Sequence, residues 1–272
     1  ASPMNAAQEF PELRLILNEN NLGFAAGNNR AAQAARSELL LLLNSDAQVQ
    51  PGAIDRLIEE IEALPQVGLL GPKLLYPDGS LQPSRGTFPN LLTEFLDNTL
   101  LYRIAPVLKG RKQLYSRAGP ADWISGACFL VRRAAYEQVG GLDEGYFMFL
   151  EDVDFCWRLK QAGWEVRYTP AAEVIHHKGF SSLPVLPDML LEDQRSAYRF
   201  FRLHHGTASV WAERLIVSFG CLVRSLAWLL AALLGRGDRS QAWGRIRALI
   251  EIFRRSWVDP AFVWGIEARG TK

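Results

Sequence analysis

The chain has 272 residues, of which 49% are hydrophobic and 22% are charged. This composition predicts a packed core and excludes a disordered chain, and the length suits one large domain or one domain with an appendage. The formal net charge of +1 gives no argument for nucleic-acid binding. The three cysteines are far apart and odd in number, which argues against a disulfide framework and against a zinc site.

The first part of the chain alternates predicted strands and helices, which is typical of an α/β sheet. The run "ELLLLL" ahead of Asn44 is apolar and bounded by turn-forming residues, so we expect a central parallel strand covered on both faces. An Asn- and Gly-rich loop at 18–29 lets a ligand approach the backbone closely. The other predicted elements are a buried strand at 13–17, a helix at 29–37, a helix at 51–64 and a strand at 67–76.

The middle of the chain is less regular. Residues 86–120 carry scattered aromatic and basic side chains, and we expect a long loop over the sheet. The elements predicted after it are a strand at 123–133, a short helix at 133–141, a helix that ends near Ala162, and two extended pieces at 165–179 split by Pro170.

Asn44, Ser45 and Asp46 follow the apolar run, at the end of a predicted strand. In open α/β sheets, ligands bind at the carboxyl ends of the strands. A carboxylate placed there suits Mg²⁺, which takes one or two carboxylates together with substrate phosphates. The same tripeptide also forms ordinary turns in which Asn and Asp hydrogen-bond their own backbone. These residues alone leave both interpretations open.

Three acids, Glu151, Asp152 and Asp154, stand directly behind the apolar run at 147–150. Acids at a helix N-terminus cap the backbone and favour the positive end of the helix dipole, and Asp154 can pair with Arg158 one turn later. Capping explains one or two of the acids. A carboxylate held at the mouth of a sheet can instead accept a proton from a hydroxyl group as a general base.

Two further segments contain residue types that occur in active sites. His176 and His177 are consecutive in an extended piece, so they point to opposite faces and at most one can share a site with the acids. Such a histidine is either a metal ligand or a surface residue. Trp123 either stacks on a sugar ring or packs in the core, and Ser125-Gly126 allow a tight turn beside it.

Taken in order, these segments resemble an inverting family 2 glycosyltransferase, and among its members the bacterial rhamnosyltransferase-like enzymes that build cell-surface polysaccharides. The resemblance covers roughly residues 13–182. It rests on the segments "NNLGFAAGNN", "LLLLNSDAQVQPGAI", "GPKLLYPDGSLQPS", "DWISGACFLVRRAAYEQVGGLDEGYFMFLEDVDFCWRLKQAGW" and "AEVIHHKGFSS". It implies the GT-A fold of nucleotide-diphospho-sugar transferases, a Rossmann-like mixed α/β sheet. The composition of the chain after this part predicts a helical C-terminal extension.

The resemblance also implies a role for individual residues. Asp152 matches the catalytic base, with Glu151 beside it. Asp46 matches the metal ligand of a DxD-type motif, written Asn-Ser-Asp here, and with His176 it implies Mg²⁺ or Mn²⁺ as cofactor. The implied donor-binding set is Asn21, Gly23, Asn29, Asn44, Ser45 and Asp46, and the implied acceptor-binding set is Trp123, Ser125 and Gly126.

The implied reaction moves a sugar, with rhamnose favoured, from a nucleotide-diphosphate sugar to a hydroxyl of a glycan or lipid-linked acceptor. An alternative is a non-catalytic, membrane-associated module that keeps the fold, and a weaker one is a nucleotidyltransferase, which needs no such base. Members of the family open with a strand that contacts the nucleobase. We therefore expect residues 1–185 to form an N-terminally truncated GT-A domain and residues 186–272 to form a helical region.

The C-terminal region contains an apolar run at 215–234 with one charge, Arg224, followed by many arginines. Its length is about that of a membrane span, but a central arginine costs roughly 2.5–3.5 kcal/mol on insertion scales. We favour a helix that lies on the cytoplasmic face of the bacterial inner membrane, with arginines on anionic headgroups. A true span and a buried soluble helix are the alternatives.

Overall fold

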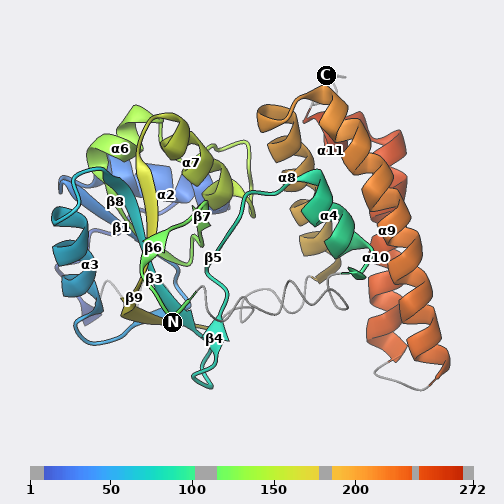
Figure 1. Ribbon diagram of the computed structural model, residues 1–272, viewed down its shortest axis with the longest axis horizontal. Helices are drawn as coiled ribbons and strands as arrows, with labels where there is room; N and C mark the ends of the chain where they lie inside the picture. The colour runs from blue at the N-terminus through green and yellow to red at the C-terminus, as the bar shows by residue number, and fades with distance from the viewer. Residues whose placement is uncertain (1–8, 102–114, 178–185, 235–238, 266–272) are drawn as a thin grey trace.

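The structure is a computed structural model, and it describes residues 9–101, 115–177, 186–234 and 239–265. A mixed sheet forms one half of it, and a group of long helices stands beside the sheet (Figure 1). The central strand pair is parallel, whereas the other pairs in the sheet are antiparallel. This confirms the predicted mixed α/β sheet with a helical C-terminal region.

The main sheet has the strand order β1-β8-β3-β9-β2, with β4 added beside β3 and β6 beside β9. A second, two-stranded sheet pairs β5 with β7. The strands are β1 (Leu39–Leu43), β2 (Ala47–Val49), β3 (Val67–Leu75), β4 (Leu81–Gln82), β5 (Arg85–Gly86), β6 (Gly119–Pro120), β7 (Trp123–Ile124), β8 (Cys128–Arg132) and β9 (Glu165–His176).

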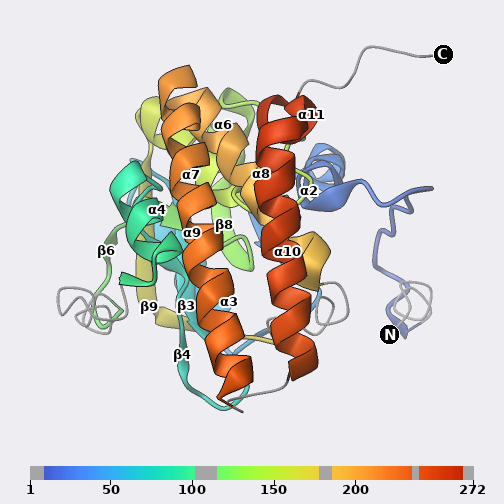
Figure 2. The same ribbon diagram turned by 90° about the vertical axis from the view of Figure 1, so that its right-hand side faces the viewer.

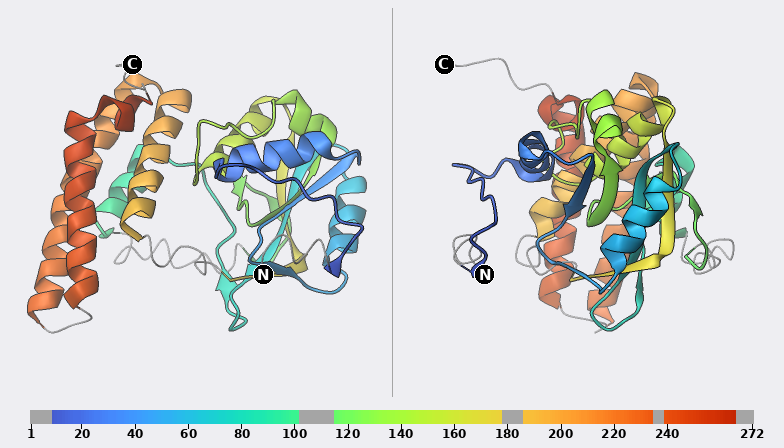
Figure 3. Two further views of the ribbon diagram at one scale, coloured as in Figure 1. Left: turned by 180° about the vertical axis from the view of Figure 1, so that it is seen from behind. Right: turned by 90° about the vertical axis from the view of Figure 1, so that its left-hand side faces the viewer.

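Helices cover both faces of the main sheet, as the views from behind and from the side show (Figure 3). One face carries α2 (Gly23–Ala34), α6 (Arg133–Gln138) and α7 (Glu151–Gln161). The other face carries α3 (Ala53–Glu62). The alternation within β8 illustrates the layering, because Phe129 and Val131 pack in the first core and Leu130 in the second.

The helical region consists of α8 (Leu186–His204), α9 (Thr207–Leu233), α10 (Arg239–Val258) and α11 (Pro260–Trp264), joined by α4 (Leu91–Asn98) from the middle of the chain (Figure 2). The approach of α4 to α9 is close, because a Cβ on Gly220 would stand 2.6 Å from the Asn98 Cβ. The predicted boundary at residue 185 lies outside the described residues and stays a prediction. One helix from before it, α4, lies among the C-terminal helices.

Two faces of α9 differ in character. Thr207–Leu233 is the one helix in the described ranges that is long and apolar enough to cross a membrane, judged by length and composition. Its large apolar side chains that are at least 49% exposed recur every three or four residues, at Leu215, Phe219, Leu222, Leu226, Leu230 and Leu233. Arg224 instead donates to the Asn98 Oδ1 at 3.2 Å and lines a cavity of about 730 Å³ between α9, α4, α8 and α10.

Several sequence expectations are corrected here. Residues 13–17 form no strand, and Leu13, Leu15 and Leu17 are 54%, 41% and 60% exposed, because no described strand pairs with them. β1 is covered on both faces as expected, but it pairs antiparallel with β8. Among the described strands β8 is its single partner, so β1 lies at an edge of the described sheet. Apolar content reports burial and says nothing of strand order or direction.

Other differences concern element boundaries. The predicted loop at 86–120 contains α4, and its residues 102–114 lie outside the described ranges. α4 starts with a capping box in which the Asn90 side chain accepts from the Leu92 and Thr93 N–H groups. α2 begins at Gly23, inside the predicted loop at 18–29. β9 runs through Pro170 as one strand, with an irregularity in its pairing to β3 where the proline cannot donate.

Candidate active site

A first cluster of polar groups forms where β1 and β9 end. The Asn44-Ser45-Asp46 turn follows β1, and Ala47 pairs with His176 across β2 and β9. The Asp46 carbonyl accepts from the His177 N–H at 2.9 Å, so the backbone holds the turn against the end of β9. As a result, the Asp46 Oδ1 lies 3.1 Å from the His176 Nε2, and the Asn44 Nδ2 lies 3.4 Å from the same nitrogen.

A buried glutamine that the sequence analysis missed completes this cluster. The Gln82 Oε1 lies 2.7 Å from the His176 Nδ1, and the Gln82 Nε2 donates to the His176 carbonyl at 3.2 Å. Gln82 is 2% exposed and His176 is 8% exposed. A histidine that bonds a polar group through one ring nitrogen presents the other nitrogen in a fixed direction.

The first cluster contains side chains of the types that bind divalent cations. One carboxylate and one imidazole nitrogen are ordinary ligands for Mn²⁺. When two ligand atoms bind the same ion at about 2.1 Å from neighbouring corners of an octahedron, they lie about 3 Å from each other. The Asp46 Oδ1 and the His176 Nε2 have this separation. The described part of the chain holds no group of three or more such side chains, so a cation here requires further ligands from substrate or water.

The acids of α7 form a second cluster. The Asp152 Oδ2 accepts from the Gly126 N–H at 2.7 Å, and its Oδ1 accepts from the Val153 N–H at 2.8 Å. Burial raises the pKa of Asp152, and these hydrogen bonds oppose the rise by favouring the ionised form. Burial, and next the charge of Asp152, raise the pKa of Glu151 to about 8. With its pKa at about 8, Glu151 is mostly protonated at neutral pH.

The turn at residues 125–127 connects the two clusters. The Asn44 N–H donates to the Ala127 carbonyl at 3.0 Å, and the neighbouring Gly126 N–H donates to Asp152. A Cβ on Gly126 would stand 3.4 Å from the Asp152 Cβ, so glycine permits this close approach. Asp152 and the start of the Asn-Ser-Asp turn are thus fixed by consecutive residues of one loop.

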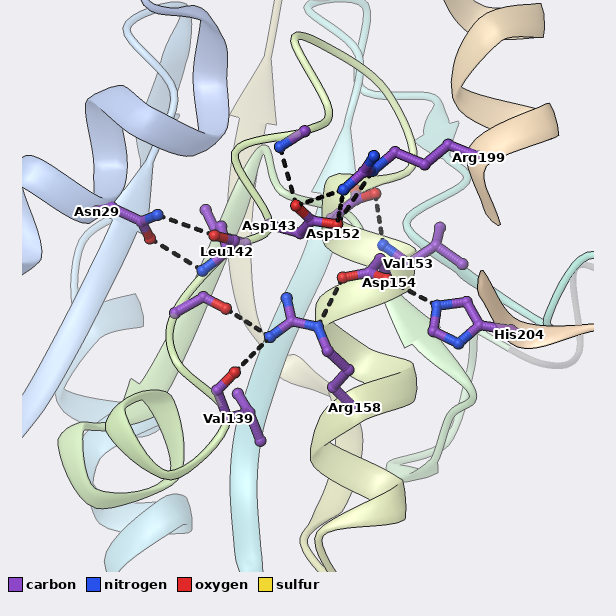
Figure 4. Close-up of polar contacts among 12 residues, drawn as sticks. Asn29, Val139, Leu142, Asp143, Asp152, Val153, Asp154, Arg158, Arg199 and His204 are labelled. Carbon is purple, nitrogen blue, oxygen red and sulfur yellow. Dashed lines mark hydrogen bonds and ion pairs between the residues drawn. The ribbon is translucent and has the colours of Figure 1, made fainter. Parts of the chain in front are cut away.

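Asp154 has a structural role, as its spacing to Arg158 predicts. The Arg158 Nε donates to the Asp154 Oδ2 at 2.7 Å, and the Arg158 Nη1 donates to the carbonyls of Val139 and Gly141 at 2.7 Å each (Figure 4). A contact that sequence reasoning missed comes from α8, where the His204 Nε2 lies 2.7 Å from the Asp154 Oδ1. Asp154 is 1% exposed and lies between these two partners.

The apolar segment ahead of the acids is anchored through its backbone. The Phe147 carbonyl accepts from the Phe24 N–H of α2 at 3.0 Å, and the Met148 carbonyl accepts from the Ser196 Oγ of α8 at 2.8 Å. Phe149 and Leu150 then take φ angles of 68° and 62°, the left-handed region that costs a non-glycine residue about 1–3 kcal/mol. The hydrogen bonds from α2 and α8 hold the chain in this strained conformation, which sets the direction in which α7 begins.

The predicted donor-binding residues lie in and around α2. Asn21 is exposed and its Oδ1 accepts from the Gly23 N–H at 3.0 Å. Gly23 has φ +80°, and a Cβ there would collide with the Phe147 carbonyl oxygen. The Asn29 side chain donates to the Leu142 carbonyl and the Glu144 carboxylate and accepts from the Leu142 N–H and the Tyr136 hydroxyl. These bonds give Asn29 a structural role, and its contact with a nucleotide stays a prediction.

The predicted acceptor-binding residues lie on the β7–β8 segment. Trp123 is half-buried, its indole N–H donates to the Thr87 carbonyl at 2.9 Å, and its ring covers Gly86. The Ser125 N–H donates at 2.9 Å to the carbonyl of Ser84, the residue before β5. Gly126 donates to Asp152 directly, whereas the indole N–H of Trp123 is used by the Thr87 carbonyl, and a role for Trp123 in acceptor binding stays a prediction.

Comparison with known proteins identifies the family. Residues 3–187 match the family described as "Glycosyltransferase like family 2", and the chain belongs to this family. It is therefore a glycosyltransferase, with a mixed α/β sheet like that of GT-A structures.

Individual relatives agree with this assignment. The chain is 36% identical over 219 residues to an N-acetylglucosaminyl-diphospho-decaprenol L-rhamnosyltransferase of Mycobacterium tuberculosis, covering 75% of this chain and 71% of that protein. It is 46% identical over 56 residues to the rhamnosyltransferase WbbL of Escherichia coli, covering 21% of each. In three dimensions it is similar to the mannosyltransferase PcManGT of Pyrobaculum calidifontis, solved with GDP-Man and Mn²⁺. That match has a TM-score of 0.51 and 14% identity, and covers 94% of this chain and 73% of that one.

Proposed function

We propose that the protein transfers a sugar, with rhamnose favoured, from a nucleotide-diphosphate donor to a hydroxyl of a lipid-linked glycan acceptor in cell-surface polysaccharide biosynthesis. The observation that carries the proposal is the attachment of Asp152 and the Asn-Ser-Asp turn to consecutive residues of one loop. The relative from Mycobacterium tuberculosis, named for rhamnosyl transfer to a diphospho-decaprenol acceptor, supports the choice of sugar and acceptor.

Asp152 acts as the general base in this proposal. Its carboxylate takes the proton from the acceptor hydroxyl while that oxygen forms a bond to the anomeric carbon, and the bond from that carbon to the nucleoside diphosphate breaks on the opposite face. The configuration of the sugar is inverted. General base catalysis of this kind contributes about 10²–10⁴-fold in rate. Glu151, whose pKa is raised to about 8, is mostly protonated at neutral pH and is therefore the weaker choice for the base.

Asp46 and His176 would hold Mg²⁺ or Mn²⁺, with Asn44 and Ser45 beside the donor. When bound, the cation offsets the negative charge of the donor diphosphate. The mannosyltransferase of similar fold was solved with Mn²⁺, which is consistent with this assignment. Asn21 and Gly23 are proposed to border the nucleotide, and Ser125 and Gly126 to border the acceptor.

We further propose that the outer face of α9 lies on the cytoplasmic face of the inner membrane. The exposed apolar stripe from Leu215 to Leu233 supports contact with lipid. Arg224 points to Asn98 and to the cavity, away from this stripe. A helix that lies in the membrane surface therefore keeps the arginine out of the lipid, whereas a membrane-spanning helix would carry its charge to the depth of the acyl chains, at a cost in free energy. A membrane position also suits a lipid-linked acceptor.

Calorimetry with a panel of nucleotide sugars, each with Mn²⁺, tests the catalytic proposal against a non-catalytic module. We expect one deoxyhexose donor to bind and, with a lipid-linked N-acetylglucosamine acceptor, to be consumed. Failure of every donor to bind, in a protein that melts cooperatively, would favour the module.

A further inference from the structure

We infer that Gln82 is a positioning residue that fixes the ring of His176, so that the Nε2 atom faces Asp46 and the two can share a divalent cation. The inference rests on the proposed metal site and deepens it. It has evidence of its own, which is the contact between the His176 Nδ1 and Gln82, on the side of the ring that faces away from Asp46. Gln82 ends β4, and His176 ends β9.

The orientation of the Gln82 amide is set by a backbone group. The carbonyl of His176 can only accept a hydrogen bond, so the group that faces it at 3.2 Å is the NH₂ of Gln82. The amide oxygen must then be the atom that faces the His176 Nδ1 at 2.7 Å. One side chain therefore contacts both the ring and the main chain of the same histidine.

This orientation determines which ring nitrogen carries the proton. The amide oxygen only accepts, so the His176 Nδ1 must donate to it and carries hydrogen. In the neutral ring, the Nε2 then has the lone pair, and its neighbours are the Asn44 Nδ2 at 3.4 Å and the Asp46 Oδ1 at 3.1 Å. Because the Asp46 carboxylate only accepts, Nε2 and Asp46 can share either a proton or a cation that takes the place of that proton. Metal-binding histidines usually donate their second ring N–H to a carboxylate, carbonyl or water, and removal of such a partner typically costs 10–100-fold in metal affinity.

A purely structural role for Gln82 is the competing explanation. Gln82 is buried, pairs with Leu74 of β3 and donates to a carbonyl at the end of β9, so it could simply join two strands. The two roles use different atoms of the amide. Positioning of the ring needs the acceptor oxygen, whereas joining the strands needs the donor nitrogen.

Two substitutions separate these roles. Gln82→Glu keeps an acceptor for the Nδ1–H and loses the donor to the carbonyl. Gln82→Met keeps the length and loses both. We would measure Mn²⁺ affinity of the metal-free protein by calorimetry, with His176→Ala as the reference for loss of the ligand. Imidazole ¹⁵N spectra of the same proteins report the tautomer directly, with His176→Ala assigning its signals among the four histidines. Thermal melting checks that each variant is folded.

We expect the wild type to show a protonated Nδ1. Gln82→Met should weaken Mn²⁺ binding about 10–100-fold and lose the single tautomer, and Gln82→Glu should retain both. The inference is overturned if Gln82→Glu and Gln82→Met lose affinity equally, or if Gln82→Met keeps the wild-type tautomer and affinity while His176→Ala loses binding. If His176→Ala binds Mn²⁺ as the wild type does, the proposed metal site itself fails.

Discussion

His204 of α8 and Asp154 of α7 lie 2.7 Å apart, and this contact joins the helical region to the helix that begins with Glu151 and Asp152. Asp154 is buried, and its other oxygen is held by Arg158. A second link lies nearby, where Arg199 of α8 binds Asp143 with both an Nε and an Nη2 contact. Helix α8 of the C-terminal region therefore holds the segment that carries the acids through two side-chain contacts.

Removal of the contact between His204 and Asp154 should destabilise the protein. His204→Ala leaves one oxygen of a buried carboxylate without its partner, and we expect a loss of about 1–3 kcal/mol in the free energy of unfolding. Urea denaturation measures it. His205→Ala is the matched control, because this neighbouring histidine has an exposed contact to the Pro89 carbonyl. Equal losses for the two variants would contradict the role given to His204.

Gly23 should be intolerant of a side chain. Gly23→Ala adds a Cβ that collides with the Phe147 carbonyl oxygen at a φ of +80°, so both the space and the backbone conformation oppose it. We expect a loss of roughly 2 kcal/mol or more in the free energy of unfolding. Gly27→Ala in the same helix meets nothing within 4 Å and should stabilise by about 0.5–1 kcal/mol. The prediction is wrong if the two substitutions change stability alike.

Glu151 should make the fold less stable as pH rises. Its pKa is about 8 in the folded protein against an ordinary value of 4.5, so the folded state binds the proton more tightly. This contribution is fully present below pH 4.5 and is lost as pH rises through about 8. Glu151→Gln mimics the protonated form.

The variant should therefore show a flatter decline of the unfolding free energy between these pH values, measured by urea denaturation in a pH series. Some slope should persist, because the pKa values of Glu94 and Glu213 are raised to about 8 and about 7 by burial first. A slope identical to that of the wild type would show that Glu151 titrates normally.

The exposed stripe of α9 should govern membrane association. Leu222→Glu with Leu226→Glu places two charges in the proposed lipid contact, and we expect a marked loss of binding to vesicles that contain anionic lipid, measured by flotation. Ile54→Glu, at an exposed apolar residue of α3 on the sheet, should bind as the wild type does. Undiminished flotation of the double variant would place the contact elsewhere.

The sequence predicted those parts of the fold whose signals are local. The helix at 51–64, the strand at 67–76 and the pair of Asp154 and Arg158 follow from periodicity and spacing, and the structure has each of them. The alternation of a strand predicted only that His176 and His177 point to opposite faces, and the choice of His176 came from the family resemblance. The resemblance to a glycosyltransferase family, which comparison confirms, came from the order of several motifs.

What the sequence did not predict depends on distant partners. Nothing local marks Gln82 as the partner of His176, because the two residues meet only when β4 and β9 both lie beside β3. The same holds for His204 and Asp154, which are 50 residues apart. α4 could have been found, because Asn90 and Thr93 are a capping signal, whereas the edge position of β1 is a property of the whole sheet.

The central claim is that Asp152 is the base for sugar transfer, and the transfer rate of Asp152→Asn tests it most directly. Asparagine can still accept from the Gly126 N–H, so the fold and donor binding should survive. We expect the rate to fall about 10²–10⁴-fold with donor affinity unchanged, while Asp55→Asn, an exposed acid of α3, keeps the wild-type rate. A folded Asp152→Asn protein that transfers sugar near the wild-type rate would contradict the account.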